Sequence, residues 1–409
     1  MTYSCRICGA ALEPFMSFGE MPIANGFLTP AEFESEYFFE LKPGFCESCS
    51  TLQILEQPDP EKMFHENYAF FSRTSKRMAT HFESYSNWVK ENYLTNEDPF
   101  VVEIGSNDGL MMEFFAKDEI RHLGVEPSAN VAEKARSHGV ETLCSFFNLE
   151  TAEKIVSGKG SADALIAANV MCHIPDLNGV AQGADRLLAP KGVLIFEEPY
   201  LGDMIESTAY DQIYDEHVFI FSAHSVQNIF ARYNFELIDV KPQSTHGGSM
   251  RYVLARKGKW PISSAVENQL LCEDKMGLHL KSTYDSFRDK CEQSRTKLVE
   301  ILKQQKEVGR RIVGYAATSK STTVLNYCNI GPDLIEYISD TTPIKQGKYS
   351  PGMHIPVRSY ETLLNEGYPD GLLLFAWNPK DEVLAKEASY LASGGEWITY
   401  VPQVDIIRK

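Results

Sequence analysis

The hydrophobic residues in the middle of the chain form short continuous runs that alternate with helical patterns. The runs lie at residues 100–104, 164–169 and 193–197, and a helical pattern follows the first of them at residues 110–115. Apolar runs without polar alternation indicate strands that are covered on both faces, as in a parallel sheet. We therefore predict an α/β domain with a doubly wound, Rossmann-like sheet.

The pattern changes near residue 265 into an amphipathic helical stretch that runs to residue 306. Its apolar residues recur at spacings of three, four and seven: Leu280, Tyr284, Phe287, Cys291, Leu298, Ile301 and Leu302. Beyond this stretch, strand-like runs appear at residues 311–316, 334–339, 371–377 and 397–402. This order predicts a helical connection followed by a second α/β, Rossmann-like domain.

The turn after the first strand has the composition of a ligand-binding loop. Glu103 lies near the end of the strand, and Gly105 and Gly109 precede the helix. Glycine permits a positive φ and a close approach of the backbone to a ligand, while a helix N-terminus presents free N–H groups. A second short strand ends at Glu126, where nucleoside-binding α/β domains place a carboxylate for the ribose. An ordinary βαβ turn with a solvated acid is the alternative.

These two motifs resemble the S-adenosylmethionine site of class I methyltransferases. The resemblance implies that the turn with Gly105 and Gly109 packs beneath the methionine part of the cofactor and that Glu126 holds its ribose. Ligands in open α/β sheets bind at the carboxyl ends of the strands. Asn169 ends the strand at residues 164–169, and His173 lies in the loop after it. Both are therefore expected on the ligand-binding edge.

Four of the nine cysteines form two Cys-x-x-Cys pairs near the N-terminus. The pairs, Cys5 with Cys8 and Cys46 with Cys49, are separated by 37 residues that are rich in turn formers. Two such pairs can place four thiolates tetrahedrally around one Zn2+ ion. Because so short a segment buries little apolar surface, we expect the ion to be structural and to contribute to folding. Two unrelated cysteine pairs are the alternative.

Charge and hydropathy limit the partners and the location. The formal net charge of −17 argues against a general nucleic-acid binder, because phosphate contacts need a basic surface. No apolar run is long enough to span a bilayer, and no signal-peptide pattern is present at the N-terminus. We therefore expect a cytoplasmic protein, in which thiols stay reduced.

A cluster of polar residues follows the strand at residues 193–197. Tyr214, Glu216 and His217 lie within four residues, immediately before an apolar run. A neutral imidazole can accept a proton at physiological pH, a phenol can hydrogen-bond an oxyanion, and a carboxylate can orient either group. The cluster is therefore a candidate catalytic site, and a surface or core role for His217 is the alternative.

Several segments together resemble the sugar C-methyltransferases of deoxysugar biosynthesis. They are the cysteine pairs, Tyr-Asp-Glu-His-x-Phe-x-Phe-Ser at 214–222, His-Gly-Gly-Ser-Met-Arg-Tyr at 246–252 and Gly-Tyr-Ala-Ala-Thr-Ser-Lys at 314–320. They occur in the order of that family and span essentially the whole chain. The resemblance implies three parts: a zinc-binding module with an active-site bridge at residues 1–75, a class I methyltransferase domain at 76–260, and a helical connection with a C-terminal α/β domain at 261–409.

The resemblance also implies a reaction, the S-adenosylmethionine-dependent methylation of C-3 of a dTDP-linked 4-keto-deoxysugar. His217 matches the general base of the family, which removes the C-3 proton next to the C-4 ketone. Tyr214 and Glu216 match its neighbours around the sugar, and Tyr68 and His173 match further active-site side chains. The ketone lets the charge spread as an enolate, so a base, an oxyanion stabiliser and an oriented methyl donor are sufficient.

The C-terminal half is expected to contact the nucleotide. It lacks the full glycine pattern of a dinucleotide site, because Ala316 and Ser319 stand in place of the later glycines. A helix N-terminus with hydroxyls and a lysine still suits a diphosphate, so Thr318, Ser319 and Lys320 are candidate ligands. Capping of the helix alone is the alternative. His246, ahead of a strand at 251–255, is a further candidate for contact with the sugar.

The sequence as a whole predicts a C-methyltransferase whose nucleoside-diphosphate 4-ketosugar lies between the methyltransferase and C-terminal domains. One rival is an O- or N-methyltransferase acting on a related nucleotide sugar. The other is an NAD-dependent oxidoreductase or a nucleotide-binding scaffold built on the C-terminal half. The sequence leaves open the substituent at C-3, the nucleobase and the oligomeric state, for which a monomer is compatible.

Overall fold

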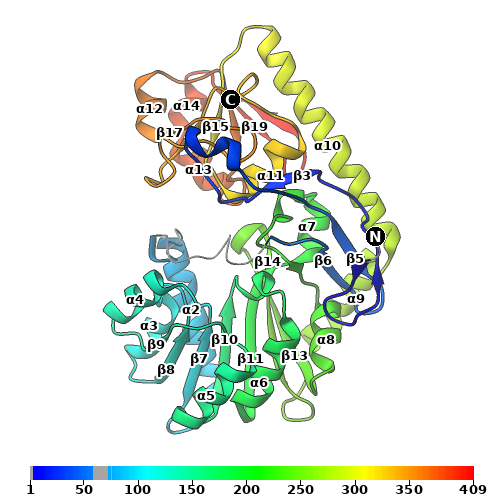
Figure 1. Cartoon of the computed structure of the whole chain (residues 1–409), viewed down its shortest axis with the longest axis vertical. Coiled ribbons are helices and arrows are strands. Elements are labelled where there is room, and N and C mark those ends of the chain that lie inside the picture. The colour runs from blue at the N-terminus through cyan, green and yellow to red at the C-terminus, as the bar shows by residue number, and fades with distance from the viewer. Residues whose placement is uncertain (1–2, 59–71, 75) are drawn as a thin grey trace.

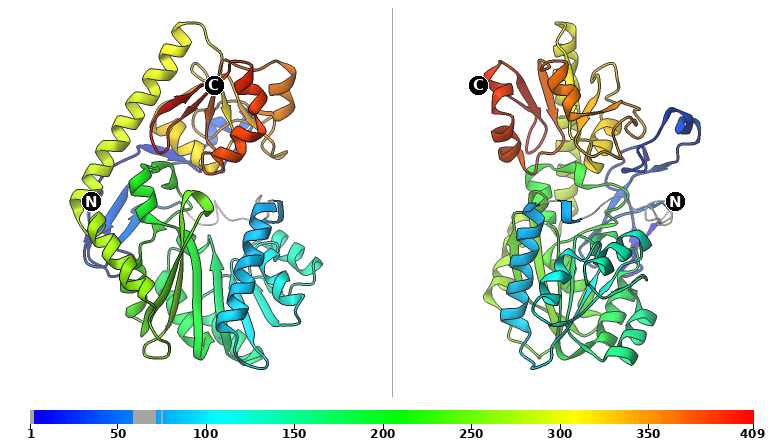
Figure 2. Two further views of the ribbon diagram at one scale, coloured as in Figure 1. Left: turned by 180° about the vertical axis from the view of Figure 1, so that it is seen from behind. Right: turned by 90° about the vertical axis from the view of Figure 1, so that its left-hand side faces the viewer.

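The computed structural model describes residues 3–58, 72–74 and 76–409, which form an N-terminal module, a central α/β domain and a C-terminal α/β domain (Figure 1). The C-terminal domain is stacked on the central domain, and the long helix α10 runs along one side (Figure 1). The N-terminal module occupies the same side and extends toward both domains (Figure 2). Within the described residues, no helix combines the length and the apolar character needed to cross a membrane.

The N-terminal module is built from short antiparallel strand pairs. The pairs are β1 with β2, β3 with β4, and β5 with β6. Its elements are β1 (Tyr3–Ser4), β2 (Ala11–Leu12), β3 (Glu20–Pro22), η1 (Pro30–Ser35), β4 (Phe38–Glu40), β5 (Pro43–Cys46) and β6 (Thr51–Ile54). The sheet of β5 and β6 gains a third strand, β12 (Phe219–Ile220), from the central domain. The module and the central domain therefore share one sheet.

The central domain contains a seven-stranded sheet in the order β13-β14-β11-β10-β7-β8-β9. All neighbours are parallel except β14, which is antiparallel to β11 and β13. The strands are β7 (Phe100–Ile104), β8 (Arg121–Val125), β9 (Thr142–Leu143), β10 (Ala162–Ala168), β11 (Leu188–Pro199), β13 (Phe235–Gln243) and β14 (Ser249–Arg256). The strand order reverses direction between β7 and β10, and such a switch point leaves a ligand crevice at the carboxyl ends of these strands.

Helices cover both faces of this sheet, which explains its uninterrupted apolar strands. Val101 packs in one core with α2 and α3, whereas its neighbours Phe100 and Val102 pack in the other core with α5, α6 and α8. The helical elements are η2 (Ser72–Thr74), α2 (Lys76–Tyr93), α3 (Leu110–Ala116), α4 (Ala129–Ser137), α5 (Leu149–Lys159), η3 (Met171–His173), α6 (Leu177–Leu187), α7 (Leu201–Ser207), η4 (Tyr210–Gln212), α8 (Ala223–Ala231) and η5 (Thr245–Gly247).

The amphipathic stretch forms two helices where the sequence pattern indicated one. Gly277, with a φ of +69°, ends α9 (Ser264–Met276), and α10 (Lys281–Glu307) begins after Leu280. Leu280 is the exposed N-cap of α10, while most of the other predicted apolar positions are buried: Tyr284, Phe287, Cys291, Leu298 and Leu302. Because α9 packs against α8 and β13, the connection begins on the central domain.

The C-terminal domain contains a six-stranded sheet in the order β17-β16-β15-β18-β19-β20, parallel except for β20. Its strands are β15 (Ile312–Tyr315), β16 (Ile338–Asp340), β17 (Val357–Ser359), β18 (Gly371–Leu374), β19 (Glu396–Thr399) and β20 (Asp405–Ile407). Its helices are α11 (Ser319–Tyr327), α12 (Tyr360–Asn365), α13 (Lys380–Lys386) and α14 (Ala388–Ala392). The strand order of this sheet also reverses direction, here between β15 and β18, which gives a second switch point. The domain boundaries expected from the sequence stay a prediction.

The N-terminal module also contacts the C-terminal domain. Leu28 forms a β-bridge with Tyr349. The Glu36 carboxylate accepts hydrogen bonds from the backbone N–H of Gly352 and from Nε2 of His354, both at 2.7 Å. The module is therefore held between the two α/β domains, next to the side on which their ligand edges meet.

Candidate active site

The four predicted zinc ligands lie together at one end of the N-terminal module. The Sγ atoms of Cys5, Cys8, Cys46 and Cys49 are all within 4.8 Å of one another. A backbone N–H and the Gln53 amide, at 3.4 and 3.1 Å, donate hydrogen bonds to Sγ of Cys5, as expected around a thiolate. Four converging thiols with no open position fit a structural Zn2+ ion and provide no site for metal catalysis.

The first glycine turn has the backbone that its sequence predicts. Gly105 has a φ of +65°, and a Cβ atom built there would lie 2.5 Å from the Val170 side chain. Gly109, with a φ of +76°, is the N-cap of α3. These two positions need glycine both for the left-handed backbone and for space. The turn therefore brings backbone N–H groups to the switch point of the sheet.

Glu126 closes the other side of this crevice at the end of β8. Its carboxylate accepts hydrogen bonds from the backbone N–H groups of Asn107, at 3.0 Å, and Ser128, at 2.8 Å. Glu103 and Asn169 lie at the carboxyl ends of β7 and β10, which flank the switch point, and in the described part of the chain one side-chain oxygen of each has no hydrogen-bond partner. Burial and the nearby carboxylate of Glu126 raise the pKa of Glu103. Such unpaired acceptors fit the hydroxyl and amino groups of S-adenosylmethionine.

His217 is buried and held in one orientation. Its Nδ1 lies 2.7 Å from the carbonyl oxygen of Gln212, and its Nε2 lies 2.9 Å from the hydroxyl of Tyr214. A carbonyl only accepts, so Nδ1 carries the proton and the lone pair lies on Nε2. Burial, followed by the charge of His173, lowers the pKa of His217, which keeps the imidazole neutral. This is the state that a general base requires.

His173 packs beside His217, with the ring centroids 5.4 Å apart and the ring planes 27° from parallel. It lies on η3, at the carboxyl end of β10. Burial lowers the pKa of His173 to about 4, with a smaller effect from His246. The ligand atoms of Cys172, His173 and His217 are within 4.8 Å of one another, a spacing that can hold a metal ion. Proton removal by a neutral imidazole needs no ion there.

Glu216 is anchored by the N-terminal module. Its carboxylate accepts a hydrogen bond of 2.6 Å from the Asn25 amide, and Asp215 accepts one of 3.1 Å from the backbone N–H of Ala24. Burial raises the pKa of Glu216, while the charge of Lys345 opposes this effect. The group that orients His217 through Nδ1 is thus a backbone carbonyl. Glu216 links residues 210–218, called the catalytic loop here because they carry the candidate base, to the N-terminal module.

The loop with His246 packs between the catalytic loop and the C-terminal domain. Its carbonyl accepts a hydrogen bond of 2.8 Å from the Gln212 amide. His246 has a φ of +54°, and a Cβ atom at the next residue, Gly247, would lie 2.4 Å from the Trp377 ring. Burial lowers the pKa of His246 to about 4, with a further effect from Lys320. The charge of His246 also contributes to the lowered pKa of His217, so the two imidazoles lie near each other, and contact of His246 with the sugar stays a prediction.

The candidate diphosphate ligands differ in their surroundings. Thr318 caps α11, because its side chain accepts a hydrogen bond of 3.1 Å from the backbone N–H of Ser321. Ser319 is the first helical residue. The ammonium of Lys320 lies 4.8 Å from the centre of the Trp377 ring in the same domain, and the Trp377 indole donates a hydrogen bond to Asp211 of the central domain. Tyr68, the remaining candidate, lies outside the described residues.

Comparison with known proteins covers the same three parts. Family models match at residues 244–402, described as a C-methyltransferase C-terminal domain, at 75–240, described as a methyltransferase domain, and at 5–64, described as a zinc binding domain. C-methyltransferase NovU of Streptomyces niveus is 31% identical over 406 residues, which cover 98% of this chain and 96% of that protein. The chain belongs to the C-methyltransferase family. It is an S-adenosylmethionine-dependent C-methyltransferase, with Zn2+ as its second cofactor.

Three further proteins match part of this C-methyltransferase. A ubiquinone biosynthesis O-methyltransferase of Colwellia psychrerythraea is 23% identical over 184 residues, 44% of this chain and 65% of that protein. The solved structure of a SAM-dependent methyltransferase of Anabaena variabilis has a TM-score of 0.34 and 17% identity, and covers 44% of this chain and 95% of that one. The magnesium protoporphyrin IX methyltransferase of Synechocystis has a TM-score of 0.34 and 13% identity, and covers 48% and 92%.

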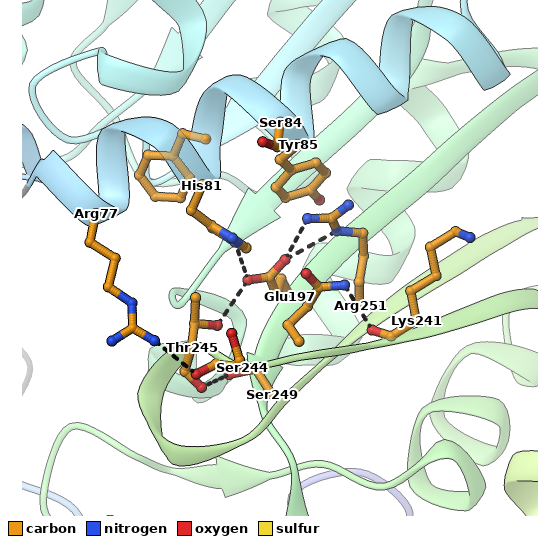
Figure 3. A network of polar contacts seen from close by, with 12 residues as sticks. Arg77, His81, Ser84, Tyr85, Glu197, Lys241, Ser244, Thr245, Ser249 and Arg251 are labelled. Atoms are coloured by element: carbon orange, nitrogen blue, oxygen red, sulfur yellow. Dashed lines mark hydrogen bonds and ion pairs between the residues drawn. The ribbon is translucent and has the colours of Figure 1, made fainter. Parts of the chain in front are cut away.

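A buried polar network supports one wall of the site in this C-methyltransferase (Figure 3). Glu197, at the carboxyl end of β11, contacts His81 of α2 at 2.6 Å and Thr245 of η5 at 3.2 Å. Arg251 of β14 donates a hydrogen bond of 2.8 Å from Nη2 to the Glu197 carboxylate, and its guanidinium stacks on the ring of Tyr85 (Figure 3). Glu197 thereby fixes the loop with His246 against the sheet.

Sequence reasoning on this C-methyltransferase missed Asp211 and Trp377. The Asp211 carboxylate is fully buried and accepts hydrogen bonds of 2.6 Å from the Trp377 indole and from the Tyr400 hydroxyl. These contacts join η4, just ahead of His217, to the segments that follow β18 and β19 of the C-terminal domain. An acid in an acidic run and a tryptophan at the end of a strand carry no signal of their pairing, which spans 166 residues.

Proposed function

We propose that this C-methyltransferase methylates C-3 of a dTDP-linked 4-keto-deoxysugar through an enolate. The observation that carries the proposal is the neutral, oriented imidazole of His217, which packs beside His173 at the carboxyl end of β10. Carbon becomes nucleophilic only after it loses a proton, so C-methylation beside a ketone needs such a base. The family assignment supports carbon as the acceptor.

The proton moves from C-3 of the sugar to Nε2 of His217. The Gln212 carbonyl keeps Nδ1 protonated, which leaves the Nε2 lone pair for the incoming proton and stabilises the imidazolium that forms. Tyr214, whose hydroxyl lies 2.9 Å from Nε2, is placed to hydrogen-bond a sugar oxygen once the substrate enters. His173 and Glu216 line the same site in our proposal.

The residues at the switch point of the central sheet hold the cofactor in our proposal. Glu126 binds the ribose hydroxyls, while Glu103 and Asn169 offer acceptors to the amino-acid end. Gly105 and Gly109 let the backbone approach it closely. S-adenosylmethionine supplies an electrophilic methyl group when bound. His217 and these residues lie on the same edge of the sheet, so the base and the methyl donor can address one carbon.

The C-terminal domain has an acid, Asp340, in a position like that of Glu126 in the central domain, and this likeness supports a nucleoside site there. Asp340, at the end of β16, accepts hydrogen bonds from the backbone N–H groups of Ala317, at 2.6 Å, and Thr342, at 2.7 Å. Glu126 is held in the same way, by the turn after the first strand and by the residue two positions on. Ala316 has a φ of +74°, close to the +65° of Gly105. The nucleoside of the sugar substrate would occupy this second site.

A cavity of about 270 Å³ lies beside Asp340. Its lining includes Tyr315, Ala316, Ser339 and Tyr360. Aromatic rings beside a carboxylate suit a base and its sugar. The diphosphate would then pass the N-terminus of α11, near Thr318 and Ser319. Lys345 joins this group, because its ammonium donates a hydrogen bond of 2.7 Å to the Ala317 carbonyl and feels the charge of Asp340.

The proposal is tested with the purified protein, S-adenosylmethionine and a panel of dTDP-4-keto-deoxysugars that differ at C-3. We expect a product heavier by one methyl group, with the label on C-3, and incorporation of solvent deuterium at C-3 when the methyl donor is replaced by S-adenosylhomocysteine. A methyl group on oxygen or nitrogen, without exchange at C-3, would favour the O- or N-methyltransferase. Protection from heat unfolding by NAD alone would favour a dinucleotide-binding protein.

A further inference from the structure

The ammonium of Lys320 lies in a buried cluster where the C-terminal domain meets the catalytic loop. It is 3.4 Å from Oδ1 of Asn378 and 4.8 Å from the centre of the Trp377 ring. Trp377 donates its indole N–H to Asp211 on η4, and its ring packs against Gly247 on η5. Through Trp377, the lysine ammonium thus lies next to the junction with the central domain.

The same cluster continues to both imidazoles of the candidate site. Asp211 precedes Gln212, whose carbonyl orients His217 and whose side-chain amide binds the carbonyl of His246. The charge of Lys320 contributes to lowering the pKa of both His217 and His246, after the larger effect of burial. The ammonium and the two imidazoles therefore lie close enough to interact through their charges.

Lys320 has donor capacity left for a ligand. A lysine ammonium has three N–H donors, and within the described residues its hydrogen-bond acceptor is the Asn378 side chain at 3.4 Å. The described residues place no carboxylate oxygen within 4.0 Å of its Nζ, so Asp211 acts on it only through its charge. Lys320 is half-buried, and a cation withdrawn from water with so few partners is costly unless a negative group completes its surroundings.

We propose that Lys320 is a catalytic residue that donates a hydrogen bond to the C-4 oxygen of the sugar and stabilises the enolate. This inference rests on the proposed function and assigns Lys320 to the reacting end of the substrate instead of the diphosphate. Lys345, with its ammonium beside Ala317 and Asp340, is the lysine at the diphosphate end. In this proposal Lys320 binds the sugar end of the substrate and Lys345 binds its diphosphate end.

The step balances without a further reactant. The C-3–H bond breaks, the proton passes to Nε2 of His217, and the bonding pair forms the C-3=C-4 double bond. The π pair of the ketone moves onto the C-4 oxygen, which becomes an oxyanion opposite the Lys320 ammonium. Lys320 keeps its proton and donates only a hydrogen bond, which is stronger to the oxyanion than to the ketone. The interaction therefore lowers the barrier to proton removal more than it strengthens binding.

Solvent exchange at C-3 tests this role apart from methyl transfer. The wild type and Lys320→Met are compared in D2O with S-adenosylhomocysteine and a 4-ketosugar that the wild type exchanges. We expect the maximal exchange rate of Lys320→Met to fall about 100-fold or more, as when an oxyanion donor is removed, with KM changed only a few-fold. Lys345→Met is the matched comparison, in which KM should rise while the maximal rate changes little. Exposed Lys303→Met should match the wild type.

Two results would overturn the role of Lys320. One is a Lys320→Met enzyme that keeps the maximal exchange rate and loses only KM, which is the behaviour of a diphosphate ligand. The other concerns the pH profile and needs no variant. Burial lowers the pKa of Lys320 to about 8 in the free enzyme, so kcat/KM for wild-type exchange should fall above that pH, whereas a kcat/KM that stays flat up to pH 10 contradicts the proposal. The groups facing Lys320 are Asp211, His217 and His246, and the two imidazoles are already neutral in this range.

Failure of this inference differs from failure of the proposed function. If no 4-ketosugar of the panel exchanges or is methylated by the wild type, the proposed function is wrong and the role of Lys320 falls with it. If the wild type exchanges and Lys320→Met exchanges equally at saturation, only the role of Lys320 is wrong. Thermal unfolding and S-adenosylhomocysteine binding of each variant check the fold, and Lys320→Gln serves if the methionine variant does not fold.

Discussion

The backbone N–H of Ile54 donates a hydrogen bond of 2.9 Å to the carbonyl of Val218. Ile54 ends the strand of the zinc module that follows Cys49, and Val218 is the neighbour of His217. The next two residues, Phe219 and Ile220, continue this contact as a third strand of the module's sheet. The position of the candidate base therefore depends on the fold of a module that supplies no metal to the reaction.

Removal of zinc should inactivate the enzyme through this shared sheet. Chelation, or Cys46→Ser, is expected to lower the melting temperature and to abolish C-3 exchange, while S-adenosylmethionine binding by the central domain persists. Metal content, thermal unfolding and exchange are measured on the same samples. Cys144→Ser alters an exposed thiol of the central domain and is the control. A zinc-free enzyme with full exchange activity would contradict this dependence.

Replacement of His217 by Asn should remove the base but keep the shape of the site. We expect C-3 exchange and methyl transfer to fall about 100- to 10,000-fold, because positioned general bases contribute effects of this size. Calorimetric titration should give unchanged S-adenosylmethionine affinity. His138→Asn, at the exposed end of α4, is the control and should leave all values unchanged. Activity that survives in His217→Asn would direct attention to His173 or Tyr214.

Gly105→Ala tests the cofactor turn. The added Cβ would lie 2.5 Å from Val170, at a φ of +65° that L-residues rarely adopt. We expect S-adenosylmethionine affinity to fall at least about tenfold, because the turn must shift to relieve the clash. Gly139→Ala is the matched control, since it has a φ of +79° but open space around the new methyl group. That variant should lose about 1 kcal/mol of stability from backbone strain and keep its cofactor affinity.

The Glu197–Arg251 pair should contribute strongly to stability. Burial alone would raise the pKa of Glu197, but its hydrogen bond with His81 and the charge of Arg251 outweigh burial and lower the pKa. Arg251→Met leaves the carboxylate buried without its partner, which costs about 3–5 kcal/mol in denaturant unfolding. Replacing both residues by apolar ones should restore part of this loss.

The pH dependence of this pair has a definite sign. A carboxylate whose pKa is lower in the folded protein stabilises the fold above its unfolded pKa. That contribution is lost as the pH falls through the folded pKa. Wild-type stability should therefore decrease on acidification, and the decrease should be smaller in Glu197→Gln. An equal decrease in both proteins would contradict the assignment.

Local sequence patterns predicted those features that depend on a single stretch of chain. The cysteine pairs, the glycine turn and the acid at the end of β8 depend on spacing within one element or one loop. The sequence alone was therefore enough to predict a metal-binding cluster and a ligand-binding turn. The break between α9 and α10 was missed, although Gly277 marks it, because the apolar spacing continues across the glycine. Roles of the individual site residues stay predictions.

Contacts between distant segments could not be predicted in this way. The carbonyl of Gln212 orients His217, but every residue has a carbonyl, so no side-chain pattern reveals the one that is used. The pairing of Asp211 with Trp377 depends on how two domains dock. Lys320 was assigned from its place at the start of a helix, whereas its ammonium contacts Trp377 and Asn378, which follow another strand of the same domain.

The segment at Ala24 and Asn25 is held by both α/β domains at once. Asn25 donates to Glu216 in the catalytic loop, and Thr322 of α11 donates to the carbonyl of Ala24 at 2.8 Å. Thr323 of the same helix binds the carbonyl of Ile213 at 3.1 Å. The segment at Ala24 and Asn25, the catalytic loop and α11 are far apart in the sequence but pack together as one unit. Chimeras between relatives should keep their substrate only when all three stretches come from the same parent.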